Sequence, residues 1–163
     1  MRRTASLAGL AGLAVLTAGC SDPPPPPLPE IGFSAAANSV SARPFLYCDV
    51  LVTKCDRNDG ALARMPVPPG TPVRITVPEE VRESPWSVVV QYRTATGEQK
   101  DPETVATFVP NQSSEYTVSL AEDGAQLQTV EVKQAGAKQD ESAAPGDIQL
   151  LARGVWSLQV ESS

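Results

Sequence analysis

The chain contains no histidine among its 163 residues. Histidine is the usual general base near neutral pH, the partner of serine and cysteine nucleophiles, and a common ligand for zinc and copper. A serine-lysine pair would need no histidine, but the sequence contains neither a G-x-S-x-G nor an S-x-x-K motif. We therefore expect no catalytic residue, no metal site and no cofactor, and interpret the protein as a non-enzyme.

Positive charge is also scarce, with 13 basic and 19 acidic residues. Residues 1–19 contain Arg2 and Arg3 and no acid, so the chain without them has 11 basic and 19 acidic residues and a net charge of −8. Strong binding to nucleic acid needs a basic stripe, which the sequence lacks. The acidic surface should likewise gain nothing from anionic lipid headgroups. We exclude nucleic acid as a partner, and expect any contact with a membrane to run through a lipid anchor alone.

No apolar run is long enough to cross a bilayer, which takes about 20 apolar residues. The uncharged stretch from Ala5 to Ala18 follows two arginines and ends in small residues, the order of a secretory signal. Its end, Thr17-Ala18-Gly19-Cys20, resembles the lipobox of bacterial lipoproteins, although Thr17 replaces the usual leucine. We predict a signal peptide over 1–19 and acylation of Cys20. The alternative is an ordinary secretory signal in which Cys20 happens to lie at the cleavage site.

The segment SDPPPPPLPE follows Cys20 directly. Consecutive prolines favour the polyproline II helix, which rises about 3.1 Å per residue, so these ten residues would span roughly 30 Å. We interpret residues 20–30 as the lipidated cysteine and a proline-rich stalk that connects a domain to the membrane. A proline run can also be a ligand for an aromatic groove, which is the second interpretation.

The remaining residues alternate between apolar and polar with a period of two, which is typical of half-buried strands. The pattern is clearest at Val73, Ile75 and Val77, and again over Trp86–Tyr92. Between these two strands, PEEVRESP has room only for a helical turn. Reversals are indicated at Thr96-Gly97, Pro110-Asn111 and Asp123-Gly124. Further strands are predicted at FSAAA, FLYCDVLV, ETVATFV, EYTVSL, LQTVEVKQ, DIQLLAR and VWSLQVE.

Eight or nine short strands of this kind predict an all-β fold: one antiparallel sandwich over residues 31–163, with immunoglobulin-like Greek-key connections. Trp86 and Trp156 are expected in its core, because an aromatic on the apolar face of a strand usually packs. Residues 134–147 are poor in apolar side chains and are predicted to form a mobile loop.

Cys48 and Cys55 are separated by six residues. Export would place them where disulfides form, so we predict a bridge between them at a turn or hairpin tip. The spacing differs from the two-residue spacing of redox-active pairs.

Two acidic patterns are weak candidates for binding sites. Asp56, Asn58 and Asp59 surround a turn, but the ligand spacing of a calcium loop is absent, so we interpret them as a polar turn. The adjacent carboxylates would splay apart on a strand, and are interpreted as solvated surface: Glu79-Glu80, Glu122-Asp123 and Asp140-Glu141. Asn111-Gln112-Ser113 matches a glycosylation acceptor but is expected to be an ordinary turn.

The chain resembles a family of uncharacterised actinobacterial cell-envelope lipoproteins that carry a domain of unknown function. The likeness rests on the lipobox ending at Cys20 and on FLYCDVLVTKC, VRITVPEEVRESPW and RGVWSLQV, and covers most of residues 31–160. It implies export and a role in the envelope, without a catalytic residue. We expect an extracytoplasmic interaction or accessory module whose partner is an envelope protein or wall glycan. The alternative is a carrier that holds a lipid or other apolar molecule between the sheets.

Overall fold

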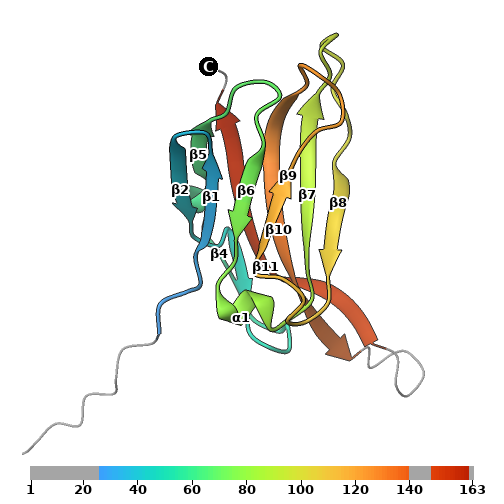
Figure 1. The fold of residues 1–163 in the computed structure, drawn as a ribbon. Helices are drawn as coiled ribbons and strands as arrows, with labels where there is room; N and C mark the ends of the chain where they lie inside the picture. The colour runs from blue at the N-terminus through green and yellow to red at the C-terminus, as the bar shows by residue number, and fades with distance from the viewer. Residues whose placement is uncertain (1–25, 140–147, 162–163) are drawn as a thin grey trace, which may run out of the picture.

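A computed structural model describes residues 26–139 and 148–161 as two β-sheets packed face to face (Figure 1). The predicted all-β antiparallel sandwich is confirmed. Residues 1–25, which include Cys20 and the predicted signal peptide, lie outside the described residues, as do residues 140–147. None of the described helices is long and apolar enough to span a membrane.

The smaller sheet has the strand order β2-β1-β6-β9, and every neighbouring pair in it is antiparallel. Its inward side chains alternate along each strand, as in β1, where the first, third and fifth residues are buried. The strands are β1 (Ile31–Ala35), β2 (Asn38–Ala42), β6 (Val73–Thr76) and β9 (Glu115–Val118).

The larger sheet has the order β4-β3-β11-β10-β7-β8, and β5 pairs with β11 away from this path. The β5–β11 pair is parallel, whereas the other pairs in this sheet are antiparallel. The strands are β3 (Leu46–Cys48), β4 (Cys55–Arg57), β5 (Ala63–Pro66), β7 (Trp86–Arg93), β8 (Glu103–Phe108), β10 (Gln126–Gln139) and β11 (Ile148–Glu161).

The core lies between the two sheets and confirms the period-two faces. Trp86, Val88 and Val90 of β7 are fully buried, and so are Trp156 and Leu158 of β11. Both tryptophans are therefore core residues, as predicted. The apolar area that they remove from water is a leading contribution to the stability of the fold.

A row of aromatic rings closes one side of the sandwich. Trp86 of β7 stacks on Phe108 of β8 at 4.1 Å between ring centroids. Phe108 in turn meets Tyr116 of β9 edge to face at 5.6 Å. Because β9 belongs to the smaller sheet, this row joins the outer strands of both sheets.

The predicted helical turn and reversals are also found. Helix α1 (Glu79–Arg82) has a single turn. Gly97 and Gly124 have positive φ, and Asn111 has a φ of 62°. Glycine and asparagine tolerate this region better than other residues, which explains their presence at these turns.

Two sequence predictions need correction. Residues 134–139 belong to β10 rather than to a loop, and the segments DIQLLAR and VWSLQVE form the single strand β11. Main-chain bonds between β10 and β11 continue from Gln134 to Gln139, whatever the polarity of the side chains. The rest of the predicted loop, residues 140–147, lies outside the described residues. The described chain has eleven strands because short β2, β4 and β5 were not predicted. The immunoglobulin-like Greek-key connection stays a prediction.

Candidate functional site

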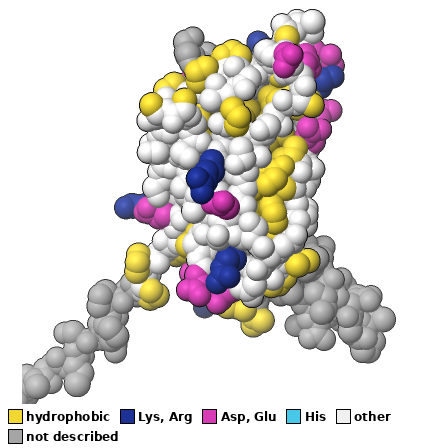
Figure 2. All heavy atoms as spheres, viewed as in Figure 1, with side chains coloured by type: hydrophobic (Ala, Val, Ile, Leu, Met, Phe, Trp, Pro, Cys, Tyr) yellow, Lys and Arg dark blue, Asp and Glu magenta, His cyan; other side chains and the backbone are white. Residues whose placement is uncertain are grey.

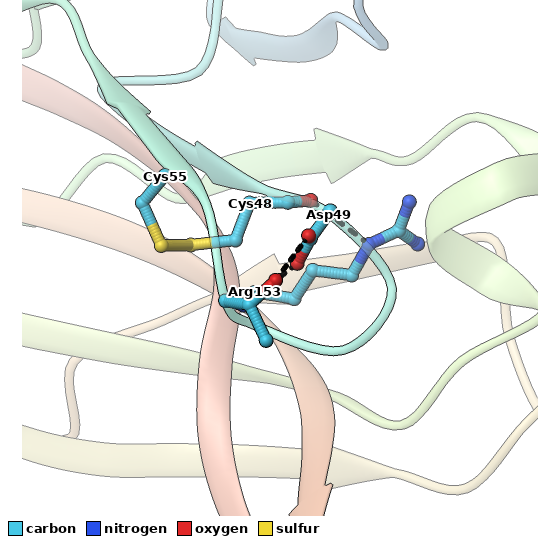
Figure 3. The surroundings of a disulfide bond; sticks show 5 residues. Cys48, Asp49, Cys55 and Arg153 are labelled. Carbon is cyan, nitrogen blue, oxygen red and sulfur yellow. Dashed lines mark hydrogen bonds between the residues drawn. A yellow bond between two sulfur atoms is a disulfide. The ribbon is translucent and has the colours of Figure 1, made fainter.

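The predicted disulfide joins the paired strands β3 and β4 (Figure 3). Cys48 and Cys55 are direct partners in the strand register, with their Cα atoms 4.0 Å apart. The bridge therefore closes a hairpin loop over residues 49–54, as the sequence predicted.

Asp49 holds this loop in shape. Its carboxylate accepts hydrogen bonds from the Thr53 backbone N–H at 2.7 Å and from the Thr53 hydroxyl at 2.5 Å. These bonds favour the ionised acid and lower the pKa of Asp49 below its usual value. The Val52 N–H also donates to the Asp49 carbonyl oxygen at 3.0 Å. The Asp49 N–H in turn donates to the Lys54 carbonyl oxygen at 2.9 Å, so the loop is closed by a covalent bond and by four hydrogen bonds.

The loop carries exposed apolar side chains at its tip. Val50 is 69% exposed and Leu51 is 65% exposed. Val52, which follows them, has a φ of 54°, a conformation that a β-branched residue rarely adopts. A Cβ added to Gly136 of β10 would lie 2.6 Å from Val52 Cγ2. The loop therefore packs closely on β10, and only a residue without a side chain leaves room for it there.

A polar cluster lies at the base of the hairpin. Arg153 of β11 donates from Nε to the Cys48 carbonyl oxygen at 3.3 Å, as Figure 3 shows. Its Nη2 lies 3.4 Å from Glu80 Oε1, and its guanidinium lies 5.2 Å from the centre of the Tyr47 ring. The Tyr47 hydroxyl donates to the same Glu80 carboxylate. The cluster joins β3, β11 and α1.

Partial burial, and then the hydrogen bond to Glu80, raise the pKa of Tyr47 to about 12. The phenol therefore keeps its proton at neutral pH and is not a nucleophile there. Since the carboxylate and the guanidinium are already paired with each other, this cluster holds elements together and offers no free acid or base.

Gln134 connects the cluster to the core. Its side chain is fully buried, and its amide donates to the Glu80 carbonyl oxygen at 2.9 Å and to the Ser84 hydroxyl at 3.2 Å. These bonds attach α1 to β10. The Gln134 Oε1 atom has no hydrogen-bond partner among the described residues.

The linker is attached beside the same hairpin. The Trp156 indole N–H donates to the carbonyl oxygen of Pro29 at 2.9 Å. Glu30 accepts from the Ser41 hydroxyl at 2.7 Å and pairs with Arg43 at 3.2 Å. The bond from Ser41, and then the one from Arg43, lower the pKa of Glu30. The end of the proline-rich segment is therefore held against the domain.

In the described residues, no group of three or more His, Cys, Asp or Glu side chains could hold a metal ion. Asp59 pairs with Arg57, and the Asn58 side chain accepts from the Gly60 N–H, which makes this segment a polar turn. Glu80 differs from the prediction, because its carboxylate has the two specific partners in the polar cluster. Asp140 and Glu141 lie outside the described residues.

Hollows in the described surface are open to solvent. One of about 490 Å³ lies between β2 and β5 and includes Glu30, Arg43 and Arg64 in its wall. Another, of about 270 Å³, includes Arg93 and three residues of β10. Figure 2 shows charged groups of both signs, scattered over the visible face without a continuous basic stripe.

Sequence reasoning found the two cysteines of the site and missed the residues around them. Cys48 and Cys55 were found through their spacing and the export signal. The apolar tip was read as part of a strand, because DVLV carries strand-forming residues. Tyr47, Glu80 and Arg153 lie far apart in the chain, and no local motif joins them.

Comparison with known families matches residues 24–161 to the family described as "Protein of unknown function (DUF2771)". No curated protein and no solved structure matches the chain. The match therefore extends across both sheets and the disulfide hairpin, but it carries no activity with it.

Proposed function

Because the chain belongs to the DUF2771 family, whose function is unknown, we propose a function from its own residues: a lipoprotein of the cell envelope, held by acyl chains on Cys20. The protein acts outside the cytoplasm as a non-enzymatic interaction or accessory module. The proline-rich segment connects its β-sandwich to the membrane. Its partner is an envelope protein or wall glycan.

The Cys48–Cys55 disulfide is the observation that supports this proposal best. Structural disulfides are typical of exported proteins and rare in the reducing cytosol. The bridge therefore agrees with the lipobox-like sequence at Cys20, although the two features are independent. One acyl chain holds a protein only reversibly, so the proposal requires two or more chains on Cys20.

The chemistry of the chain supports a non-enzymatic role. It has no histidine, and the best-defined polar cluster is saturated by its own contacts. The acidic net charge disfavours nucleic acid as a partner.

A Cys20→Ser variant tests the anchor. In the native bacterium, we expect radiolabelled palmitate to enter the parent protein and not the variant, and the variant to leave the membrane fraction. Equal labelling of both, or intact parent protein in the cytosol, would overturn the proposed anchor. Crosslinking in whole cells followed by purification tests for a partner. If neither a protein nor a wall fragment is recovered under several growth conditions, the proposed role as an interaction module is contradicted.

The alternative function is a carrier for a lipid or other apolar molecule. It receives less support, since Trp86 and Trp156 are packed against neighbouring side chains rather than around a space. Native mass spectrometry of protein purified from its own membrane distinguishes the two. A bound apolar molecule of constant mass would favour the carrier over the module.

A further inference from the structure

The linker and the disulfide hairpin loop project from neighbouring positions on the domain. Trp156 contacts both of them: its N–H bonds to Pro29 of the linker, and its ring meets the ring of Tyr47 at 6.0 Å. Tyr47 directly precedes Cys48, where the hairpin loop begins. The loop over residues 49–54 therefore lies at the end of the domain from which the chain runs back toward Cys20 (Figure 1).

Exposed apolar side chains gather at this linker end. Among the described residues, five large hydrophobic side chains are exposed, and one of them, Leu62, lines the open hollow that also includes Glu30. Val109 belongs to the turn whose Asn111 N–H bonds to the last residue of α1, Arg82. Figure 2 shows hydrophobic side chains at the lower end of the domain, beside the linker. The four at the linker end are Leu28, Val50, Leu51 and Val109.

The tip of the loop is held in its exposed position. The disulfide and the Asp49 bonds close the loop, and Val52 stays at positive φ against Gly136. A strained backbone persists only where its surroundings enforce it, and such strain gathers at functional sites. A relaxed loop could instead fold Val50 and Leu51 onto the domain, so the constraint keeps these two side chains in water.

We propose that Val50 and Leu51 insert into the headgroup and outer acyl region of the bilayer that holds the Cys20 anchor, and so fix the orientation of the domain on the membrane. This inference rests on the proposed function, since it needs the anchor. Two aliphatic side chains alone would hold a free protein weakly. A tethered tip, however, meets the surface at an effective concentration of roughly millimolar, so weak insertion is enough.

The position of the linker favours a bilayer over a protein as the occupant. Residues 21–30 would span roughly 30 Å as a polyproline II helix, and docking of the tip requires the segment to lie along the membrane. Leu28 and the prolines give it an apolar surface suited to that position. The linker end carries charges of both signs, with Lys54 in the loop itself and Glu79 paired with Arg82, so apolar burial rather than net charge must drive the contact.

Quenching by brominated lipid tests the proposal on the full acylated protein. Leu51→Trp places an indole at the tip, and Val50→Trp is a second variant at the adjacent position. Each protein is reconstituted into vesicles of phosphatidylcholine and phosphatidylglycerol, with or without bromine on the acyl chains. Trp86 and Trp156 are buried in the core, far from the substituted positions in sequence, and their emission is subtracted with the parent protein. The matched control is Glu98→Trp, in the exposed turn after β7 at the opposite end of the domain.

We expect brominated lipid to reduce the added emission of both tip variants by about twofold or more, and to leave that of Glu98→Trp unchanged. The quenching should persist at high salt, because it depends on apolar burial. Flotation of the vesicles separates the two proposals. Protein that floats without quenching at the tip overturns the insertion alone, whereas protein that does not float overturns the anchor and the insertion together. Quenching that disappears at high salt also overturns the insertion.

A protein partner at the tip is the competing outcome. A photoreactive benzoylphenylalanine at position 51, in the native membrane, should crosslink to lipid. Crosslinks to one protein in place of lipid would overturn the insertion in favour of docking.

Discussion

Trp156 donates its indole N–H to the carbonyl oxygen of Pro29 over 2.9 Å, across 127 positions of the chain. A fully buried core residue thus binds the end of the linker. The bond satisfies a polar group that the core would otherwise leave unpaired, and it fixes the end of the linker at Pro29 against the domain.

Trp156→Phe should release the linker. The change removes the bond to Pro29 and part of a buried ring, so we expect a loss of about 1–3 kcal/mol in the free energy of unfolding. Cleavage of the chain near Leu28 by a protease should become faster. The matched control is Trp86→Phe, because the Trp86 Nε1 atom is buried without a partner among the described residues. Equal cleavage in the two variants would contradict the role of Trp156.

Removal of the disulfide should weaken the fold without abolishing it. In the chain-entropy model, closing so short a loop contributes roughly 2–3 kcal/mol. Cys55→Ser should therefore fold and melt at a lower temperature, and so should the protein with both Cys48 and Cys55 changed to serine. Far-ultraviolet circular dichroism during heating measures this. A Cys55→Ser variant without any cooperative transition would show that the core depends on the hairpin.

Gly154→Ala should be more damaging than its size suggests. An added Cβ would lie 2.5 Å from Cη2 of the buried Trp156 ring. Because that ring is enclosed, we expect a loss of about 1–3 kcal/mol in urea unfolding. Gly32→Ala is the control, since its added Cβ would meet ordinary contacts at 3.8 Å. Similar stability of the two variants would show that the Trp156 ring moves aside at little cost.

Tyr47 should make stability depend on pH in alkali. Its pKa is raised from 10.0 to about 12 in the folded state, so folding favours the protonated phenol. This contribution is complete below pH 10 and is lost as the pH rises toward 12. Tyr47→Phe should remove that part of the slope and cost about 1 kcal/mol at neutral pH through the lost bond to Glu80. Urea unfolding from neutral pH into this alkaline range measures both the slope of stability with pH and the loss at neutral pH. An unchanged slope in the variant would assign the titration to another group.

Asp49 should loosen the hairpin loop in acid. Its pKa is lowered from 3.8, so the ionised carboxylate stabilises the loop above that value and the effect is lost as the pH falls through the lowered pKa. Protection of the Thr53 amide from hydrogen exchange should decrease over the same range. In the Asp49→Ala variant, the Thr53 amide should be unprotected at every pH, while the amides of the core stay protected. Strong protection of Thr53 in this variant would mean that the disulfide alone holds the loop.

Local patterns in the sequence predicted the strands that face the core. Alternation works at β6 and β7 because successive side chains on a strand point to opposite faces, and only one face is buried. Alternation does not predict the full length of β10 and β11, because main-chain bonds between these strands extend past the apolar residues. The predicted loop at Gln134 was wrong for this reason, since a buried polar residue looks like a loop residue in the sequence.

By itself, the sequence determined the all-β class, the Cys48–Cys55 bridge and the absence of histidine chemistry, because these depend on residue type and short spacing. Only the tertiary structure decided that Tyr47, Glu80 and Arg153 meet below the hairpin and that Trp156 binds the linker. Arg153 and Cys48 are 105 positions apart, and strand order and register bring them together. Such contacts depend on how strands pair across the whole chain, which no local period encodes.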